Sequence, residues 1–228
     1  MNSPKTVLVL GASGAMGQYL LPRLMEMGYR IDGVSLDEVK NPLPGVSYLR
    51  ANAKDRNVYR ELLAKNYDGI VDFLTYSTAE LPWYLPQALN HTDHYIFLSS
   101  CRVFDDKEHP VRESSPQLID SSTDVLLRNS DDYCIYKARG ENILRASARR
   151  NWTIVRPATT YSFMRYQLVT LEAANNVGRA FAGKRVVVPE QAREKQATLS
   201  WGGDVARMLS GLIFLDRALG EGFKELQK

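Results

Sequence analysis

Three glycines at even spacing, Gly11, Gly14 and Gly17, stand directly between an apolar run and an amphipathic segment. The run Thr6 to Leu10 reads as a strand buried on both faces, and Met16 to Met27 carries apolar residues at helical spacing. Between a strand and a helix, such glycines allow a tight turn, a close approach of backbone to a pyrophosphate, and close helix–strand packing. The helix N-terminus adds free N–H groups and a favourable dipole. We therefore predict dinucleotide binding by the loop Gly11, Ser13, Gly14, Ala15, Met16 and Gly17.

The rest of the chain alternates strand-like and helix-like segments. Strands are predicted at 29–36, 46–49, 69–74, 95–99 and 152–155, and helices at 56–65, 82–90 and 132–149. This alternation predicts right-handed crossovers and an α/β fold, a doubly wound parallel Rossmann sheet. After residue 160 the pattern is mixed, with a helix expected near 167–181, a strand at 185–188 and a helix near 204–215. We expect residues 1–160 to form the dinucleotide-binding domain and 161–228 a small, reduced substrate-binding region packed on it.

Composition excludes several classes of function. The 228 residues are 44% hydrophobic with a net charge of +3 and no basic run, so nucleic-acid binding is not indicated. The two cysteines, Cys101 and Cys134, have no metal-ligand spacing, so we expect no metal site and no disulfide framework. No apolar run approaches the ~18 residues of a membrane span, and we expect a soluble cytoplasmic protein. The histidines His91, His94 and His109 are expected on the surface or in loops.

Tyr133 and Lys137 are four residues apart on one predicted helix and therefore share a face. A tyrosine has a pKa of about 10 and is a poor acid–base catalyst at neutral pH. A nearby ammonium favours the phenolate, so the pair could carry a proton to or from a substrate hydroxyl. The lysine also suits a hydrogen bond to a nicotinamide ribose. The alternative is an aromatic residue on a core face beside a solvated lysine.

Several further segments follow in the order of a known family. Ser99-Ser100-Cys-Arg-Val-Phe104 is similar to a Ser-Ser-x-x-Val-Tyr-Gly signature, with Phe104 and Asp105 in place of the usual Tyr-Gly. Together with the glycine spacing, these segments resemble the extended short-chain dehydrogenase/reductase family, of the NAD-dependent epimerase/dehydratase type. The resemblance implies that Ser100 holds the reacting oxygen beside Tyr133 and Lys137. The other matching segments are Pro110 to Pro116, Arg156-Pro157 to Tyr161, and Asp204-Val205-Ala206.

The cofactor expected from this resemblance is NAD or NADP. Asp37 stands 20 residues after Gly17, where an acidic residue normally binds the adenosine ribose. When Gly28 is aligned with the glycine that ends the family's first helix, however, that position falls on Ser35. Asp37 is thus either a ribose ligand or a solvated turn residue, and the choice of cofactor stays open. Asn52 takes the place of an adenine-contacting aspartate.

The resemblance implies an NAD(P)-dependent epimerase, dehydratase or reductase that acts on a sugar nucleotide by hydride transfer, and that forms homodimers in many members. Arg156 and Arg165 could grip a nucleotide diphosphate with bidentate hydrogen bonds, although Arg156 in its Arg-Pro motif is as often structural. One alternative is an NADPH-dependent reductase of a non-sugar carbonyl, such as a natural-product intermediate. Another is a non-catalytic dinucleotide sensor or scaffold on the same fold.

Overall fold

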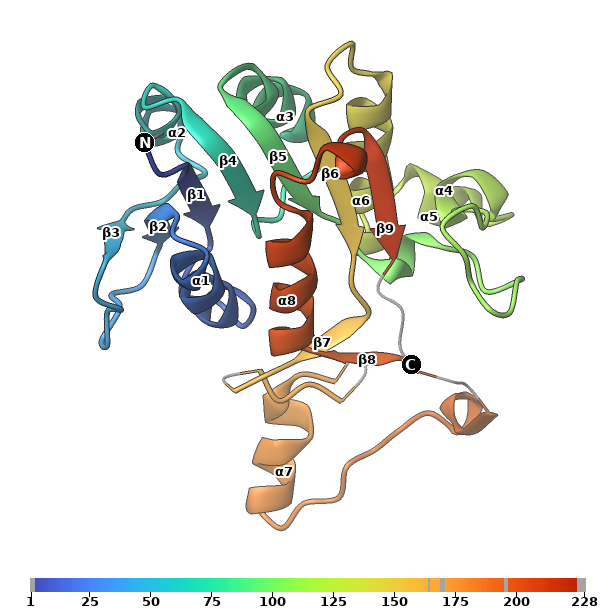
Figure 1. The fold of residues 1–228 in the computed structure, drawn as a ribbon. Coiled ribbons are helices and arrows are strands. Elements are labelled where there is room, and N and C mark those ends of the chain that lie inside the picture. The colour runs from blue at the N-terminus through green and yellow to red at the C-terminus, as the bar shows by residue number, and fades with distance from the viewer. Residues whose placement is uncertain (1–2, 164, 169–170, 195–196, 225–228) are drawn as a thin grey trace.

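The computed structural model describes residues 3–163, 165–168, 171–194 and 197–224. Within them, seven parallel strands form a central sheet in the order β3-β2-β1-β4-β5-β6-β9 (Figure 1). The strands are β1 (Thr6–Leu10), β2 (Arg30–Ser35), β3 (Val46–Arg50), β4 (Tyr67–Asp72), β5 (Thr92–Leu98), β6 (Trp152–Arg156) and β9 (Glu221–Lys224). The order of the first six is that of a doubly wound sheet, which confirms the predicted Rossmann fold.

Helices cover both faces of this sheet (Figure 1). They are α1 (Gly17–Glu26), α2 (Arg56–Leu63), α3 (Leu81–Asn90), α4 (Leu118–Ser121), α5 (Val125–Asn129), α6 (Tyr133–Ala146), α7 (Val177–Phe181) and α8 (Gly202–Leu212). Alternate residues of β1 enter two different cores. Val7 and Val9 lie in the core that α1 and α8 cover, whereas Leu8 and Leu10 lie in the core that α2, α3 and α6 cover. Burial on both faces is the reason why β1 is a continuous apolar run.

The segment after β6 forms a small second layer below the sheet in Figure 1. Its strands β7 (Thr159–Tyr161) and β8 (Leu199–Trp201) pair in parallel and were not predicted. The helix expected near 167–181 is wrong in extent: only a 3₁₀ turn at Ala173–Asn175 and α7 are helical, and positions 169–170 lie outside the described residues. The strand expected at 185–188 is also wrong. Val187 and Val188 are 74% and 53% exposed. The segment pairs with no strand among the described residues.

The chain then returns to the central sheet. Helix α8 packs against α1, and β9 joins the sheet next to β6. Strand β9 was missed because its sequence, Glu-Gly-Phe-Lys, holds a single large apolar residue, Phe223. No helix in the described part of the chain is long and apolar enough to cross a membrane.

His94 lies in β5 and is 1% exposed, so its expected place on the surface or in a loop was wrong. Its Nδ1 accepts a hydrogen bond from the backbone N–H of Phe214 at 2.8 Å. Its Nε2 is 2.7 Å from the hydroxyl oxygen of Thr153. Burial lowers the pKa of His94 to about 4, because a charged imidazolium would lose its hydration there. The imidazole is therefore neutral and links β5, β6 and the loop after α8.

Candidate active site

The glycine loop connects β1 to α1 at the carboxyl edge of the sheet. Gly11 has a φ of +82°, a left-handed conformation that glycine adopts without strain. Its amide and that of Ala12 both donate to the carbonyl of Val34, at 2.9 and 3.0 Å, which ties the loop to β2. A Cβ on Gly17 would come within 2.3 Å of the Ala12 carbonyl oxygen. The third glycine is thus required for the close approach of α1 to the loop.

The loop and the start of α1 fit a pyrophosphate. Helix α1 has no side-chain cap and no acidic residue in its first turn. The amides of Ala15, Met16 and Gly17 have no hydrogen-bond acceptor among the described residues. A Cβ on Gly14 would lie 3.2 Å from the Gly11 carbonyl oxygen and would crowd this cradle. Free N–H groups at a helix N-terminus are the donors that a phosphate needs.

The two residues expected at the adenosine end follow β2 and β3. Ser35 ends β2, and its hydroxyl donates to the carbonyl of Asp37 at 2.9 Å. Asp37 itself is exposed two residues beyond the strand, and Asn52 is exposed after β3. The side-chain oxygen of Asn52 accepts the backbone N–H of Lys54 at 3.0 Å and so holds a local turn. The roles of Asp37 and Asn52 in cofactor binding stay predictions.

Ser100 and Tyr133 lie close together and line the same cavity. Ser100 follows β5, and Tyr133 is the first residue of α6, whose N-terminus Asp132 caps. Burial raises the pKa of Tyr133, whereas its hydrogen bond with Ser100 and the charges of Arg165 and Arg102 oppose that rise. Each of these three influences favours the phenolate over the neutral phenol. The charges that favour the phenolate thus come from Arg102 and Arg165, and not from Lys137 as the sequence suggests.

Lys137 lies one helical turn beyond Tyr133, with its Nζ 6.0 Å from the centre of the tyrosine ring. The side chain is 2% exposed and donates to the carbonyls of Leu98, at 2.6 Å, and Leu74, at 3.4 Å. Burial lowers the pKa of Lys137 to about 8, while the charges of Asp72 and Glu141 oppose this shift. The ammonium is therefore buried and still mostly charged at neutral pH, and it uses two of its three N–H donors on backbone carbonyls.

A cavity of about 270 Å³ opens beside Tyr133. Met16 of the glycine loop lies in its wall, so the proposed phosphate site and the tyrosine share one space. The lining residues are Met16, Leu98, Ser99, Ser100, Arg102, Tyr133, Pro157, Ala158, Thr159, Thr160, Arg165, Gln167 and Glu172. The cavity thus collects residues from the ends of β1, β5 and β6, the side of a doubly wound sheet where ligands bind.

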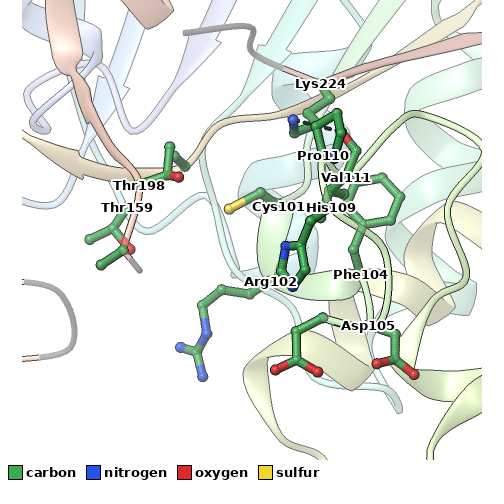
Figure 2. A pocket seen from close by; sticks show the side chains of 13 residues that line it. Cys101, Arg102, Phe104, Asp105, His109, Pro110, Val111, Thr159, Thr198 and Lys224 are labelled. Carbon is green, nitrogen blue, oxygen red and sulfur yellow. Dashed lines mark hydrogen bonds between the residues drawn. The ribbon is translucent and has the colours of Figure 1, made fainter. Parts of the chain in front are cut away.

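A second cavity, of about 520 Å³, adjoins the first and shares Arg102, Ala158 and Thr159 with it. Figure 2 shows Thr159 and Thr198 on one side of it and the loop with Phe104, His109 and Pro110 on the other. The Arg102 side chain lies between these two walls. Together the two cavities give room for a substrate larger than the reacting group alone.

The two arginines proposed for substrate binding have different surroundings. Arg156 is 1% exposed and holds the Glu141 carboxylate with two hydrogen bonds of 2.8 Å each. Its guanidinium is committed to this buried ion pair, so we assign Arg156 a structural role and not a substrate role. Arg165 lines the cavity beside Tyr133, is 40% exposed, and is 3.8 Å from Glu172.

Sequence reasoning missed two charged residues of this site. Arg102 places its guanidinium carbon 5.4 Å from the centre of the Tyr133 ring. Its position two residues after Ser100 could have identified it. Asp72 ends β4 and acts on Lys137 by its charge. The end of a parallel strand is a signal for a site residue, but Asp72 matches no motif that the sequence analysis used.

These features define a class: a Rossmann protein with a glycine loop between β1 and α1, a serine and a tyrosine at the adjacent cavity, and a buried lysine one helical turn beyond the tyrosine. A family model, described as the NAD-dependent epimerase/dehydratase family, matches residues 7–189. The chain belongs to this family of enzymes. That membership confirms the expected family resemblance and the nicotinamide dinucleotide as the cofactor class. Among curated proteins, no sequence matches the chain.

Solved structures show the same fold at low sequence identity. An epimerase from Methanothermobacter thermautotrophicus is 14% identical, with a TM-score of 0.74 over 98% of this chain and 72% of that one. UDP-glucose 4-epimerase from Thermotoga maritima, solved with UDP-glucose, is 18% identical, with a TM-score of 0.71 over 96% and 76%. A UDP-glucuronic acid 4-epimerase mutant from Bacillus cereus, solved with NAD, is 14% identical, with a TM-score of 0.72 over 98% and 78%.

Proposed function

We propose that this chain is an NAD(P)-dependent epimerase, dehydratase or reductase that acts on a sugar nucleotide through Ser100, Tyr133 and Lys137. The observation that carries the proposal is that Ser100 and Tyr133 line one cavity whose wall also includes Met16 of the glycine loop. A proton-transfer pair and a phosphate cradle thus face one space. Hydride transfer next to a hydroxyl needs both.

The bound nicotinamide would supply the hydride acceptor and donor. Tyr133 would take the proton of a substrate hydroxyl while the hydride leaves the same carbon, so that an O–H and a C–H bond break and a C=O bond forms. Ser100 would hold the reacting oxygen by a hydrogen bond, and Lys137 would offer its remaining N–H to the nicotinamide ribose. Arg102 and Arg165 would stabilise the Tyr133 phenolate that accepts this proton. The reverse transfer to either face of the carbonyl would give the original alcohol or its epimer.

For the cofactor we propose NAD, in line with the family's description. The pyrophosphate would rest on the backbone of the loop from Gly11 to Gly17. Asp37 would reach the adenosine ribose from the end of β2, and Asn52 would lie near the adenine. No basic residue is required at the ribose for NAD, whereas NADP would need one for its 2′-phosphate.

For the substrate we propose a nucleoside diphosphate sugar. The Thermotoga maritima neighbour was solved with UDP-glucose, and the two adjoining cavities offer room for a sugar beside Tyr133 and a further group beyond Arg102. Arg165 is the residue that we propose for the diphosphate. A cytoplasmic location and a homodimer remain proposals from the family resemblance.

The proposal is tested by incubating the protein and NAD with a panel of UDP-sugars and following the sugar signals by NMR. We expect one sugar to be converted, and Tyr133→Phe to slow the conversion by about 10²–10⁴-fold, the usual contribution of a general acid–base group. Tyr136→Phe, on the same helix three residues further on, is the matched control and should keep near wild-type turnover. A Tyr133→Phe variant with wild-type turnover would refute the assignment.

The same panel separates the alternatives. Reduction of small ketones with NADPH, and conversion of no sugar nucleotide, would assign the chain to reductases of non-sugar carbonyls. Cofactor binding with no turnover of any compound would identify a sensor or scaffold.

A further inference from the structure

The carboxyl group of Asp72 is buried and accepts three hydrogen bonds. The side chain is 1% exposed at the end of β4. Its Oδ2 accepts the hydroxyl protons of Tyr95 at 2.8 Å and of Tyr76 at 2.9 Å, and its Oδ1 accepts the backbone N–H of Leu74 at 2.9 Å. Burial raises the pKa of Asp72, and these hydrogen bonds oppose that rise. Three donors aimed at one carboxyl group favour its ionised form.

This carboxyl group is connected to Lys137 through one residue. The Asp72 carboxylate accepts a hydrogen bond from the backbone N–H of Leu74. The carbonyl of Leu74 in turn accepts a hydrogen bond from the Lys137 ammonium at 3.4 Å. The carbonyl of Leu98 accepts a second one at 2.6 Å. The geometry at the end of β4 thus determines where one of the two acceptors of the ammonium lies.

The charges of two carboxyl groups, Asp72 and Glu141, act on Lys137. The two groups differ in whether a cation other than Lys137 is bound to them. Glu141 is bound by the buried Arg156 through two hydrogen bonds and by Arg145 at 2.9 Å, so its negative charge is already matched. Asp72 forms no ion pair with any residue that the structure describes; its hydrogen-bond partners are neutral. Asp72 therefore carries the unmatched negative charge beside the buried ammonium.

The remaining neighbours of the pair are aromatic. Phe97 of β5 has its ring centre 5.1 Å from the Lys137 ammonium, and Tyr133 of α6 has its ring centre 6.0 Å away. Tyr59, Tyr76 and Tyr95 surround Asp72, and burial raises the pKa of each of these three hydroxyls. They stay neutral donors in the physiological range and do not replace Asp72 as a counter-charge.

We propose that Asp72 is a positioning residue for the active site: its buried carboxylate keeps Lys137 protonated and, through Leu74, holds the ammonium with one N–H left for the cofactor. The proposal rests on the proposed role of Lys137 in cofactor binding. It assigns Asp72 no contact with substrate. A merely structural Asp72 would fix the turn after β4 and leave the protonation of Lys137 unchanged.

The test is the titration of Lys137 by NMR in protein labelled with ¹³C at the lysine Cε, the signal being assigned by its loss in Lys137→Arg. Wild-type Lys137 should titrate near pH 8. In Asp72→Asn, which keeps the shape of the side chain and removes its charge, the midpoint should fall by about one pH unit or more, a tenfold change in the protonation equilibrium. Tyr95→Phe, which keeps the carboxylate and removes one hydrogen bond, should shift it less. An unchanged midpoint in folded Asp72→Asn would overturn the proposal.

Wild-type protein gives a second test that needs no substitution. With ¹³C-labelled aspartate, the Asp72 carboxyl signal should be that of a carboxylate at pH 7 and should move when Lys137 titrates. A protonated Asp72 carboxyl group at pH 7 would overturn the proposal even if Asp72→Asn failed to fold. Both readouts are independent of turnover, so they test the role of Asp72 even if the proposed sugar-nucleotide activity fails.

Discussion

The body of the molecule, residues 3–160 and 202–224, and the lobe, the described residues between 161 and 201, differ in how their apolar side chains are placed. In the body, both faces of the sheet are filled, and Leu8, Leu20 and Ile96 have no exposed surface. In the lobe, Phe181 is 90% exposed and Phe163 66% exposed. A residue that touches many buried neighbours has its position fixed by packing, whereas a residue on the lobe lacks that support.

This difference divides the candidate site. The glycine loop, Ser100, Tyr133 and Lys137 belong to the body, so packing against two cores orients them before any ligand binds. Arg165, Gln167 and Glu172 line the same cavity from the lobe. We interpret the body as the cofactor and acid–base part of the site, and the lobe as the part that selects the substrate. Stability and cofactor binding should therefore respond to changes in the body and hardly at all to equivalent changes in the lobe.

The largest difference is expected for two ion pairs. Glu141→Gln leaves the Arg156 guanidinium buried without its carboxylate and should lower the free energy of unfolding by about 3–5 kcal/mol. Glu190→Gln in the lobe breaks a pair with Arg193 in which both side chains are more than three-quarters exposed, and should cost under about 1 kcal/mol. Urea denaturation of both variants and of the wild type measures the loss of unfolding free energy in each. Equal costs would show that burial does not separate the two regions.

Acid should destabilise the body through His94. The folded-state pKa of His94 is about 4, below the ordinary value of 6.5, so the unfolded chain takes up a proton first as the pH falls. The contribution of neutral His94 to the free energy of unfolding is fully present above pH 6.5. It is lost between pH 6.5 and 4, a total of about 3 kcal/mol. Unfolding free energies of wild type and His94→Gln across this range give the comparison. Parallel curves for the two proteins would contradict the assignment of acid sensitivity to His94.

A smaller difference is expected for two glycines near helix starts. Gly17→Ala places a methyl group within 2.3 Å of the Ala12 carbonyl oxygen, and should cost about 1–3 kcal/mol and weaken NAD binding. A Cβ on Gly178, in α7 of the lobe, would lie 3.5 Å from the Ala173 carbonyl oxygen, an ordinary van der Waals contact, so Gly178→Ala should be neutral or stabilise by up to about 1 kcal/mol. Thermal unfolding and NAD titration measure both effects. Unchanged NAD affinity in Gly17→Ala would argue against the loop as the phosphate site.

The parts of the fold that the sequence could predict are those whose signal is local. The strand before Gly11, the helix after Gly17 and the four-residue spacing of Tyr133 and Lys137 each depend on neighbouring residues, and the structure places them as expected. The pairing of β7 with β8 could not be predicted, because it joins two three-residue strands about 40 residues apart. The apolar run at 185–188 predicts a strand by its composition, but this segment pairs with no strand among the described residues.

The same contrast holds for the site. Motif order brought Ser100, Tyr133 and Lys137 together, and the structure adds that the charges acting on the Tyr133 hydroxyl are those of Arg102 and Arg165. The surroundings of Asp72 lay beyond sequence reasoning, because Tyr76 and Tyr95 reach it from a loop and from β5. The Arg156 guanidinium was a plausible diphosphate ligand by chemistry alone, and only its buried contact with Glu141 shows otherwise.

We propose that the loop from Gly11 to Gly17 and the buried Lys137 together form a nicotinamide dinucleotide site. The most direct measurement is to denature freshly purified protein, identify any released nucleotide by mass spectrometry, and titrate NAD and NADP into protein freed of nucleotide. We expect NAD to be released or, if the protein is purified empty, to bind when added, and to bind more weakly to Gly17→Ala. A protein that releases no dinucleotide and binds neither NAD nor NADP would contradict the claim.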